Sequence, residues 1–176
     1  MSINNIPSGP DVPEILYAII EISSHSYPVK YEMNKTHNEL FVDRFIASAM
    51  RYPCNYGYIN KTKSQDGDPL DILVYTPYPI LPKTIIPCRP IGMLRMKDES
   101  GHDAKIIAVP NHHVSTEYLS IQDIHNLPTL LKQQIQIFFE NYKNAEKDKW
   151  VKIIGWDNKQ HAIQEIEQSI IRYQKC

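Results

Sequence analysis

Short apolar runs of strand type fill the first two thirds of the chain, and helical spacing of apolar residues appears only after them. The runs 16–22, 29–33, 40–45, 72–75, 91–96 and 105–109 are rich in β-branched and aromatic residues and are separated by turn signals. Residues 51–60 read as irregular or short strand, and residues 1–13 as an extended arm. Many strands followed by late helices predict an α+β domain, mainly β, with a closed or partly closed sheet and helices packed outside it.

Two helices are predicted near the end of the chain. Between Leu127 and Asn144, apolar residues recur at spacings of four, three and four, which gives one stripe of Leu131, Ile135, Phe138 and Tyr142. A short strand over residues 151–154, closed by Gly155, separates this helix from a second one over residues 158–173. At 176 residues and without a repeat or linker, the chain is expected to form one domain, residues 1–176.

Composition excludes several classes of protein. A net charge of −1 and a pI near 6.6 argue against a nucleic-acid binder, which is usually basic. No apolar run approaches the roughly 20 residues of a membrane helix, and the start of the chain lacks the pattern of a signal peptide. Cys54, Cys88 and Cys176 are odd in number and widely spaced, which favours reduced thiols. We therefore expect a cytoplasmic protein that binds neither nucleic acid nor a membrane.

The strongest chemical signal is the run Asp66-Gly67-Asp68-Pro69-Leu70-Asp71. Its three carboxylates repel one another around a tight turn, so the arrangement is costly without a cation. Hard divalent ions such as Mg²⁺ prefer oxygen ligands of this kind. The alternative is a solvated acidic turn, since Asp, Gly and Pro are common turn residues.

Further carboxylates strengthen the metal interpretation. Asp98 and Asp103 flank a four-residue loop, and in a hairpin they would face each other on one side of the sheet. The alternative places both at a hairpin tip in water. Glu21 lies in an apolar strand, where a carboxylate must face solvent, find a partner or bind a cation.

Basic and phenolic side chains complete the set. Lys30 and Glu32 share one strand face, and Lys105 shares a face with Asp103 if that strand is regular. Arg44, Tyr52, Tyr56, Tyr142 and Lys143 add further donors. Taken alone, each lysine or arginine is most simply a solvated surface residue, and Tyr142 is most simply a core residue of the helix. Together they suit a metal-bound polyanion such as a phosphate ester or anhydride. Phosphate-loop, dinucleotide and HExxH motifs are missing from the sequence.

At this point the chain resembles the soluble family I inorganic pyrophosphatases. The run 66–72 looks like the signature of that family, with Asp at its first, third and sixth positions. The resemblance also covers residues 20–22, 28–32, 40–44, 52–58, 88–90, 103–105 and 138–143, in the order of the family. It implies a five-stranded OB-type β-barrel with two main α-helices packed outside, and the activity of an inorganic diphosphatase.

The resemblance also implies a role for each candidate residue. Metal ions would be held by Asp66, Asp71, Asp98, Asp103 and, mainly through water, Glu21. Asp68 would act as general base towards the attacking water. The phosphoryl groups would be held by Lys30, Arg44, Tyr56, Lys105, Tyr142 and Lys143, with Glu32 and Tyr52 as secondary members of the cavity. The implied cofactor is Mg²⁺, several ions per site, with Mn²⁺ or Zn²⁺ able to substitute.

The implied reaction is hydrolysis of pyrophosphate to two phosphates by direct attack of a metal-activated water. The implied assembly is a homo-oligomer, a hexamer, with the long helix as its contact, because Ile137 and Phe139 lie off the main stripe. Some bacterial members carry histidines on that helix, and this chain has none there. Two rival functions stay open: a phosphohydrolase acting on nucleotides, and an OB-type oligonucleotide binder that stacks bases on Tyr52, Tyr56 and Tyr58.

Overall fold

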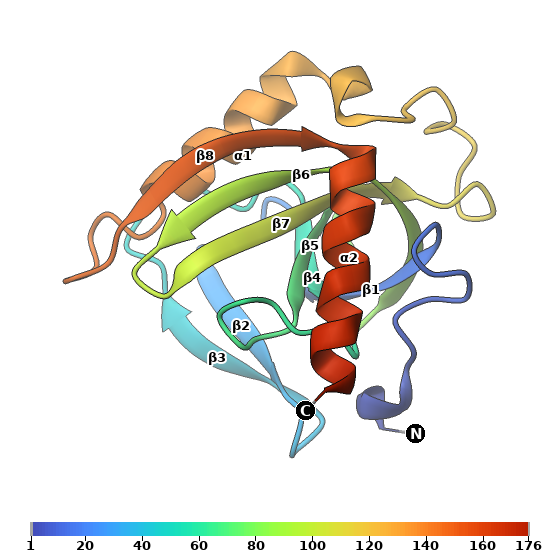
Figure 1. Ribbon diagram of the computed structural model, residues 1–176. Helices are drawn as coiled ribbons and strands as arrows, with labels where there is room; N and C mark the ends of the chain where they lie inside the picture. Colours follow the sequence, from blue (N-terminus) through green and yellow to red (C-terminus); the bar gives the residue numbers. More distant parts are fainter. Residues whose placement is uncertain (1, 176) are drawn as a thin grey trace.

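Eight strands and two α-helices make up a computed structural model that describes residues 2–175 (Figure 1). In chain order the elements are η1 (Ile3–Asn5), β1 (Leu16–Ile22), β2 (Val29–Asn34), β3 (Glu39–Phe45), β4 (Asn55–Ile59), β5 (Leu70–Val74), β6 (Ile85–Asp98), β7 (Gly101–Pro110), η2 (Ile124–Asn126), α1 (Thr129–Asn141), β8 (Val151–Asn158) and α2 (Lys159–Gln174). Figure 1 shows α2 crossing in front of the sheet and α1 lying behind β8.

Five strands close on themselves in a ring. The order is β1-β4-β5-β7-β6, and β6 pairs again with β1, where Leu16 lies opposite Cys88. All pairs in the ring are antiparallel except β5 with β7, which run parallel with Asp71 opposite Lys105. β8 extends the sheet along the second half of β6. The expected closed sheet with two helices is confirmed.

Alternation along the strands divides the core between the two faces of the ring. On β5, Ile72 and Val74 join one apolar cluster, which α2 covers with Ala162 and Ile166. Leu73 joins the cluster on the opposite face, where α1 packs through Leu131, Ile135, Phe138 and Phe139. Asp71 lies two residues before Leu73, so its side chain emerges on the α1 face. The functional site is built on that face.

β2 and β3 form a separate hairpin. Within residues 2–175 they pair only with each other, from Val29 opposite Phe45 to Asn34 opposite Glu39. Figure 1 shows this hairpin, in light blue and cyan, projecting below the ring; its strand β2 packs next to β1. Phe45 is 78% exposed. Two-stranded hairpins are marginally stable alone, so this one depends on contacts with the rest of the chain.

The structure corrects the predicted bounds of several elements. β6 starts at Ile85 rather than residue 91 and accommodates Pro90 beside an irregularity between Pro90 and Gly92. Prolines are tolerated in strands at such bulges. β8 runs through Gly155 to Asn158 instead of ending at the glycine. Residues 55–59 form a regular strand, and α1 is shorter at both ends than predicted.

The two described cysteines are free thiols, and both are buried. Burial raises the pKa of Cys54 and of Cys88 to about 12, so these thiols are protonated and unreactive at neutral pH. Cys176 lies outside the described residues. Neither described helix has the length and apolar character needed to cross a membrane.

Candidate active site

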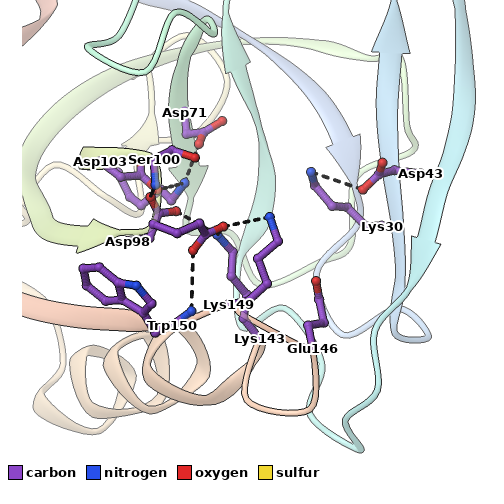
Figure 2. Close-up of polar contacts among 12 residues, drawn as sticks. Lys30, Asp43, Asp71, Asp98, Ser100, Asp103, Lys143, Glu146, Lys149 and Trp150 are labelled. Carbon is purple, nitrogen blue, oxygen red and sulfur yellow. Dashed lines mark hydrogen bonds and ion pairs between the residues drawn. The ribbon is translucent and has the colours of Figure 1, made fainter.

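A cavity of about 440 Å³ opens where the α1 face of the ring meets the β2–β3 hairpin. Of the described residues, seven with carboxylates, six with cationic side chains and four tyrosines line it. The carboxylates are Glu21, Glu32, Asp68, Asp71, Asp98, Glu99 and Asp103; the cations are Lys30, Lys35, Arg44, Lys105, Lys143 and Lys149; the tyrosines are 52, 56, 58 and 142. Figure 2 shows Asp71, Asp98 and Asp103 on one side of the site and Lys30 with Asp43 on the other.

The most buried charge of the cavity, Lys105, lies on the ring strand β7, close to Asp103 on the same strand and to Asp71 on β5. Lys105 is 3% exposed and pairs with Asp103 at 2.8 Å and with Asp71. Burial alone lowers the pKa of Lys105, but the charges of Asp103 and Asp71 outweigh it and hold that pKa well above its ordinary value. Burial raises the pKa of Asp103 in spite of the neighbouring Lys105. This side of the cavity is therefore a fixed, desolvated charge network.

The tip of the β6–β7 hairpin forms the next part of the wall. Lys143 Nζ lies 2.7 Å from Asp98 and 3.4 Å from Glu99, and Lys149 Nζ lies 2.8 Å from Glu99. The connecting loop has two residues rather than the predicted four, because Asp98 pairs with Gly101 and Asp103 with Met96. Asp98 and Asp103 are diagonal rather than opposite one another, but the two-residue period keeps both on one face.

The acidic turn brings Asp68 to the mouth of the cavity. Gly67 has φ +99°, a conformation that glycine adopts without strain. The Asp68 N–H donates to Asp66 Oδ1 at 3.1 Å, and the Ser64 N–H donates to the carbonyl of Asp68 at 2.7 Å. Asp68 stays exposed and lines the cavity, whereas Asp66 is not among the lining residues.

Glu21 is buried and faces the cavity rather than open solvent. Its Oε1 accepts the Met33 N–H at 2.7 Å, which ties β1 to β2. Burial, together with the charges of Asp71 and Glu32, raises the pKa of Glu21 to about 8 although the Met33 bond opposes the shift. A cation bound nearby would lower this pKa, because it favours the charged form of the carboxyl.

The hairpin supplies the opposite wall of the cavity. Lys30 on β2 contacts Glu32 and lies 3.4 Å from Asp43. Arg44 on β3 donates to Asp43 at 2.7 Å and, from Nε, to Glu146 at 2.9 Å. Burial lowers the pKa of each cation, but these neighbouring carboxylates reverse the shift and raise it overall. Both cations are charged at neutral pH and reach the cavity.

Three of the tyrosines belong to the aromatic layer between the ring and α1. Tyr52 packs at a tilt against Tyr56 and Phe138, with ring centroids 5.0 and 4.5 Å away, and the ring centroid of Tyr142 lies 5.4 Å from that of Phe138. Burial raises the pKa of Tyr52, of Tyr56 and of Tyr142. These phenols are therefore neutral hydrogen-bond donors at the floor of the site.

The structure thus brings thirteen of the fourteen predicted site residues to one cavity, Asp66 being the exception. It also adds Lys35, Glu99 and Lys149, which the sequence analysis did not propose. Glu99 belongs to the predicted loop between Asp98 and Asp103, and this position next to two proposed metal ligands was the one sequence signal that could have identified it. Lys35 lies in the β2–β3 turn and Lys149 in the irregular segment before β8, and nothing in their sequence context separates them from surface lysines.

The donor set fits hard divalent cations, since it consists of carboxylate oxygens. Through residues 2–175, no three acidic, histidine or cysteine side chains already converge closely enough to hold an ion. The ammonium of Lys105 instead lies between Asp71 and Asp103 and offsets part of their negative charge. A bound cation would share this role.

Comparison with known proteins agrees with this geometry. The family model described as inorganic pyrophosphatase matches residues 18–174. The inorganic pyrophosphatase of Buchnera aphidicola (subsp. Baizongia pistaciae) is 60% identical, covering 99% of this chain and 100% of the relative, and that of Escherichia coli K12 is 55% identical, covering 98% of each. The structure of the Thermus thermophilus inorganic pyrophosphatase superposes with a TM-score of 0.90 at 39% identity, covering 99% of both chains. This chain therefore belongs to the inorganic pyrophosphatase family.

Proposed function

We propose that this chain hydrolyses pyrophosphate to two phosphates by direct attack of water. One observation carries the proposal: seven carboxylates and six cations from separate segments line the same cavity of about 440 Å³. Carboxylates alone would repel a polyanion, and cations alone would bind it without activating water. A phosphoanhydride held through metal ions requires both.

Magnesium is the proposed cofactor, with Mn²⁺ or Zn²⁺ able to substitute. Its proposed ligands are Asp66, Asp71, Asp98 and Asp103, with Glu21 acting through water. When bound, the ions would neutralise the charge of the substrate and make a bound water more acidic. Asp66 is a proposed ligand by its place in the acidic turn, close enough to Asp103 and Asp68 for their charges to act on it.

The proposed chemistry of the side chains follows from their positions. Asp68 is exposed at the mouth of the cavity, where it accepts the proton of the attacking water. Lys30 and Arg44 hold a phosphoryl group from the hairpin. Lys105, Lys143, Tyr56 and Tyr142 donate to phosphoryl oxygens from the ring and from the end of α1, with Glu32 and Tyr52 supporting them. Fixed donors around developing charge supply the largest share of catalysis in phosphoryl transfer.

The geometry argues against the rival function of oligonucleotide binding. Tyr52 and Tyr56 are 2% and 7% exposed, so their faces are covered and offer no platform for stacked bases. A nucleotide substrate would need a further pocket for its base and sugar. The discriminating assay compares phosphate release from pyrophosphate with release from ATP in magnesium; faster release from ATP would overturn the proposal.

We also propose a homo-hexamer in the cytoplasm. The buried, protonated thiols of Cys54 and Cys88 suit a reducing compartment. On α1, Ile137 is 52% exposed and available for a subunit contact, whereas Phe139 is 1% exposed and packs within its own chain. Light scattering at neutral pH tests the assembly, and a monomer would contradict it.

A further inference from the structure

The N-terminal arm contacts the hairpin that carries two of the proposed substrate-binding cations. Lys30 and Arg44 lie on β2 and β3, which pair only with each other within the described residues. Each cation already has carboxylate neighbours at the open end of the hairpin. Its turn, residues 35–38, is attached separately. Lys83 Nζ donates to the carbonyl of Asn38 at 3.2 Å and pairs with Glu39 at 2.7 Å, and residues 2–6 provide a further attachment. We call residues 2–6 the strap.

The strap is fastened to the ring through one buried side chain. Asn60, which directly follows β4, is 3% exposed. Its Nδ2 donates to the carbonyls of Ile3 at 3.1 Å, Asn4 at 3.3 Å and Ile6 at 2.7 Å. A buried amide that donates to three carbonyls of the strap fixes its path against the ring.

The strap then binds the turn of the hairpin. The Ile3 N–H donates to Asn38 Oδ1 at 2.7 Å, and Asn4 Nδ2 donates to the carbonyl of Lys35 at 3.0 Å. Asn38 has φ +57°, a conformation that Asn tolerates. Both hydrogen bonds act on the segment whose Lys35 side chain lines the cavity.

Apolar packing reinforces the same attachment. Ile3 is buried in a small cluster with Ile19 of β1, Met33 of β2 and Tyr58 of β4. Met33 is also the residue whose N–H donates to Glu21 in the cavity. The strap, the hairpin and the ring therefore meet directly behind the site.

We propose that residues 2–6 are a positioning strap that holds the β2–β3 hairpin, and with it Lys30 and Arg44, in its substrate-binding position. Asn38 and Asn60 are its positioning residues. This inference rests on the proposed pyrophosphatase function. Holding binding groups in place lowers the cost of ordering them when the substrate arrives. Release of the strap should therefore weaken substrate binding more than it slows turnover.

The test uses two substitutions at Asn38 in the full chain. Asn38→Gly removes the side-chain oxygen that accepts the Ile3 N–H but can still adopt the positive φ. Asn38→Asp retains both the acceptor oxygen and the ability to adopt the positive φ. Asn38→Gly should raise KM for pyrophosphate about 2- to 10-fold, the loss expected for one net hydrogen bond, with kcat changed less than about 2-fold. Asn38→Asp should retain the original KM. An unchanged KM in Asn38→Gly, or an equal rise in both variants, overturns the proposal.

A second measurement does not depend on catalysis. Hydrogen exchange of the amides in residues 29–45 should accelerate in Asn38→Gly, while the amides of β5 and β7 keep their protection. If hydrogen exchange in the hairpin is unchanged in Asn38→Gly, the strap proposal is wrong even if the enzyme is active. Failure of the unsubstituted protein to hydrolyse pyrophosphate would instead overturn the proposed function and leave the exchange result interpretable.

Discussion

The two walls of the cavity hold their charges in different ways. On the ring wall, Lys105 is almost fully buried between Asp71 and Asp103, on strands that are paired along both edges. On the hairpin wall, the Lys30 and Arg44 side chains are 19% and 29% exposed, and their strands pair only with each other within residues 2–175. The ring wall therefore couples charge to the stability of the whole fold, while the position of the hairpin wall depends on a few local attachments.

This difference suggests a division of tasks. Rigid carboxylates suit ions that demand a fixed ligand geometry, as magnesium does. Cations on a less constrained hairpin suit a substrate that must enter and leave as two phosphates. The following predictions test whether the two walls differ as described.

Removal of metal should have the largest effect. Treatment with EDTA should abolish pyrophosphate hydrolysis, by about 10³-fold or more, since the ions supply both charge neutralisation and water activation. Added magnesium should restore activity and raise the melting temperature, because the ions bind the folded state. Calcium should bind but support little turnover, owing to its larger coordination shell. Full activity in EDTA would refute the proposed role of the ring wall.

Asp68→Asn and Asp71→Asn should separate the general base from a metal ligand. Asp68→Asn should lower kcat about 10²- to 10⁴-fold, the range of general-base catalysis, with metal affinity changed much less. Asp71→Asn should lower both. Turnover assays with calorimetric titration of magnesium provide the comparison. Equal losses of metal affinity in the two variants would show that the assignment of Asp68 is wrong.

Lys105→Met should test how strongly the ring wall is coupled to folding. The substitution leaves Asp71 and Asp103 without their buried partner, which should cost about 3–5 kcal/mol of unfolding free energy in EDTA. Magnesium should recover part of this loss, since it can replace the missing positive charge. Denaturant unfolding of this variant is compared with Lys152→Met, a change at an exposed lysine of β8. Equal stability of the two variants would contradict the coupling.

Glu146→Gln, a change between α1 and β8 at a partner of the hairpin cation Arg44, should have the smallest effect. It removes the ion pair with Arg44, whose partners are both partly exposed, so the loss of stability should be about 0.2–1 kcal/mol. The KM for pyrophosphate should rise only about 2-fold, because Asp43 still holds the guanidinium. Thermal unfolding and steady-state kinetics measure both. A destabilisation as large as that of Lys105→Met would erase the contrast between the walls.

Local signals in the sequence predicted much of this arrangement. The bounds of β1 are those of its apolar run, and the spacing of Leu131, Ile135 and Phe138 predicted the face that α1 buries. The acidic turn was recognisable because Gly67 and Pro69 shape it locally. Such features depend on residues close together in the chain, so a single sequence reveals them.

The parts that were missed depend on tertiary contacts. The predicted strand excluded Pro87 and Pro90, yet both lie in β6, where pairing with β1 and β7 overrides the usual proline preference. Lys149 lines the cavity beside Glu99, which belongs to a hairpin tip far away in the sequence. Gly155 looked like the end of a strand, but β6 extends the pairing beyond it. No local pattern encodes these partners.

Closure of the ring has a consequence for how the chain reaches its native state. Strands β4 and β5 are neighbours in sequence and can pair early, but β1 must find β6, where Leu16 meets Cys88 across much of the intervening chain. The parallel pairing of β5 with β7 also requires that β6, which lies between them in the sequence, folds back on β7 as a hairpin. Closing such long loops costs entropy before the new contacts repay it, which slows folding. Asp71 and Lys105 face each other only after that pairing forms, so the charge network of the site is a late product of folding.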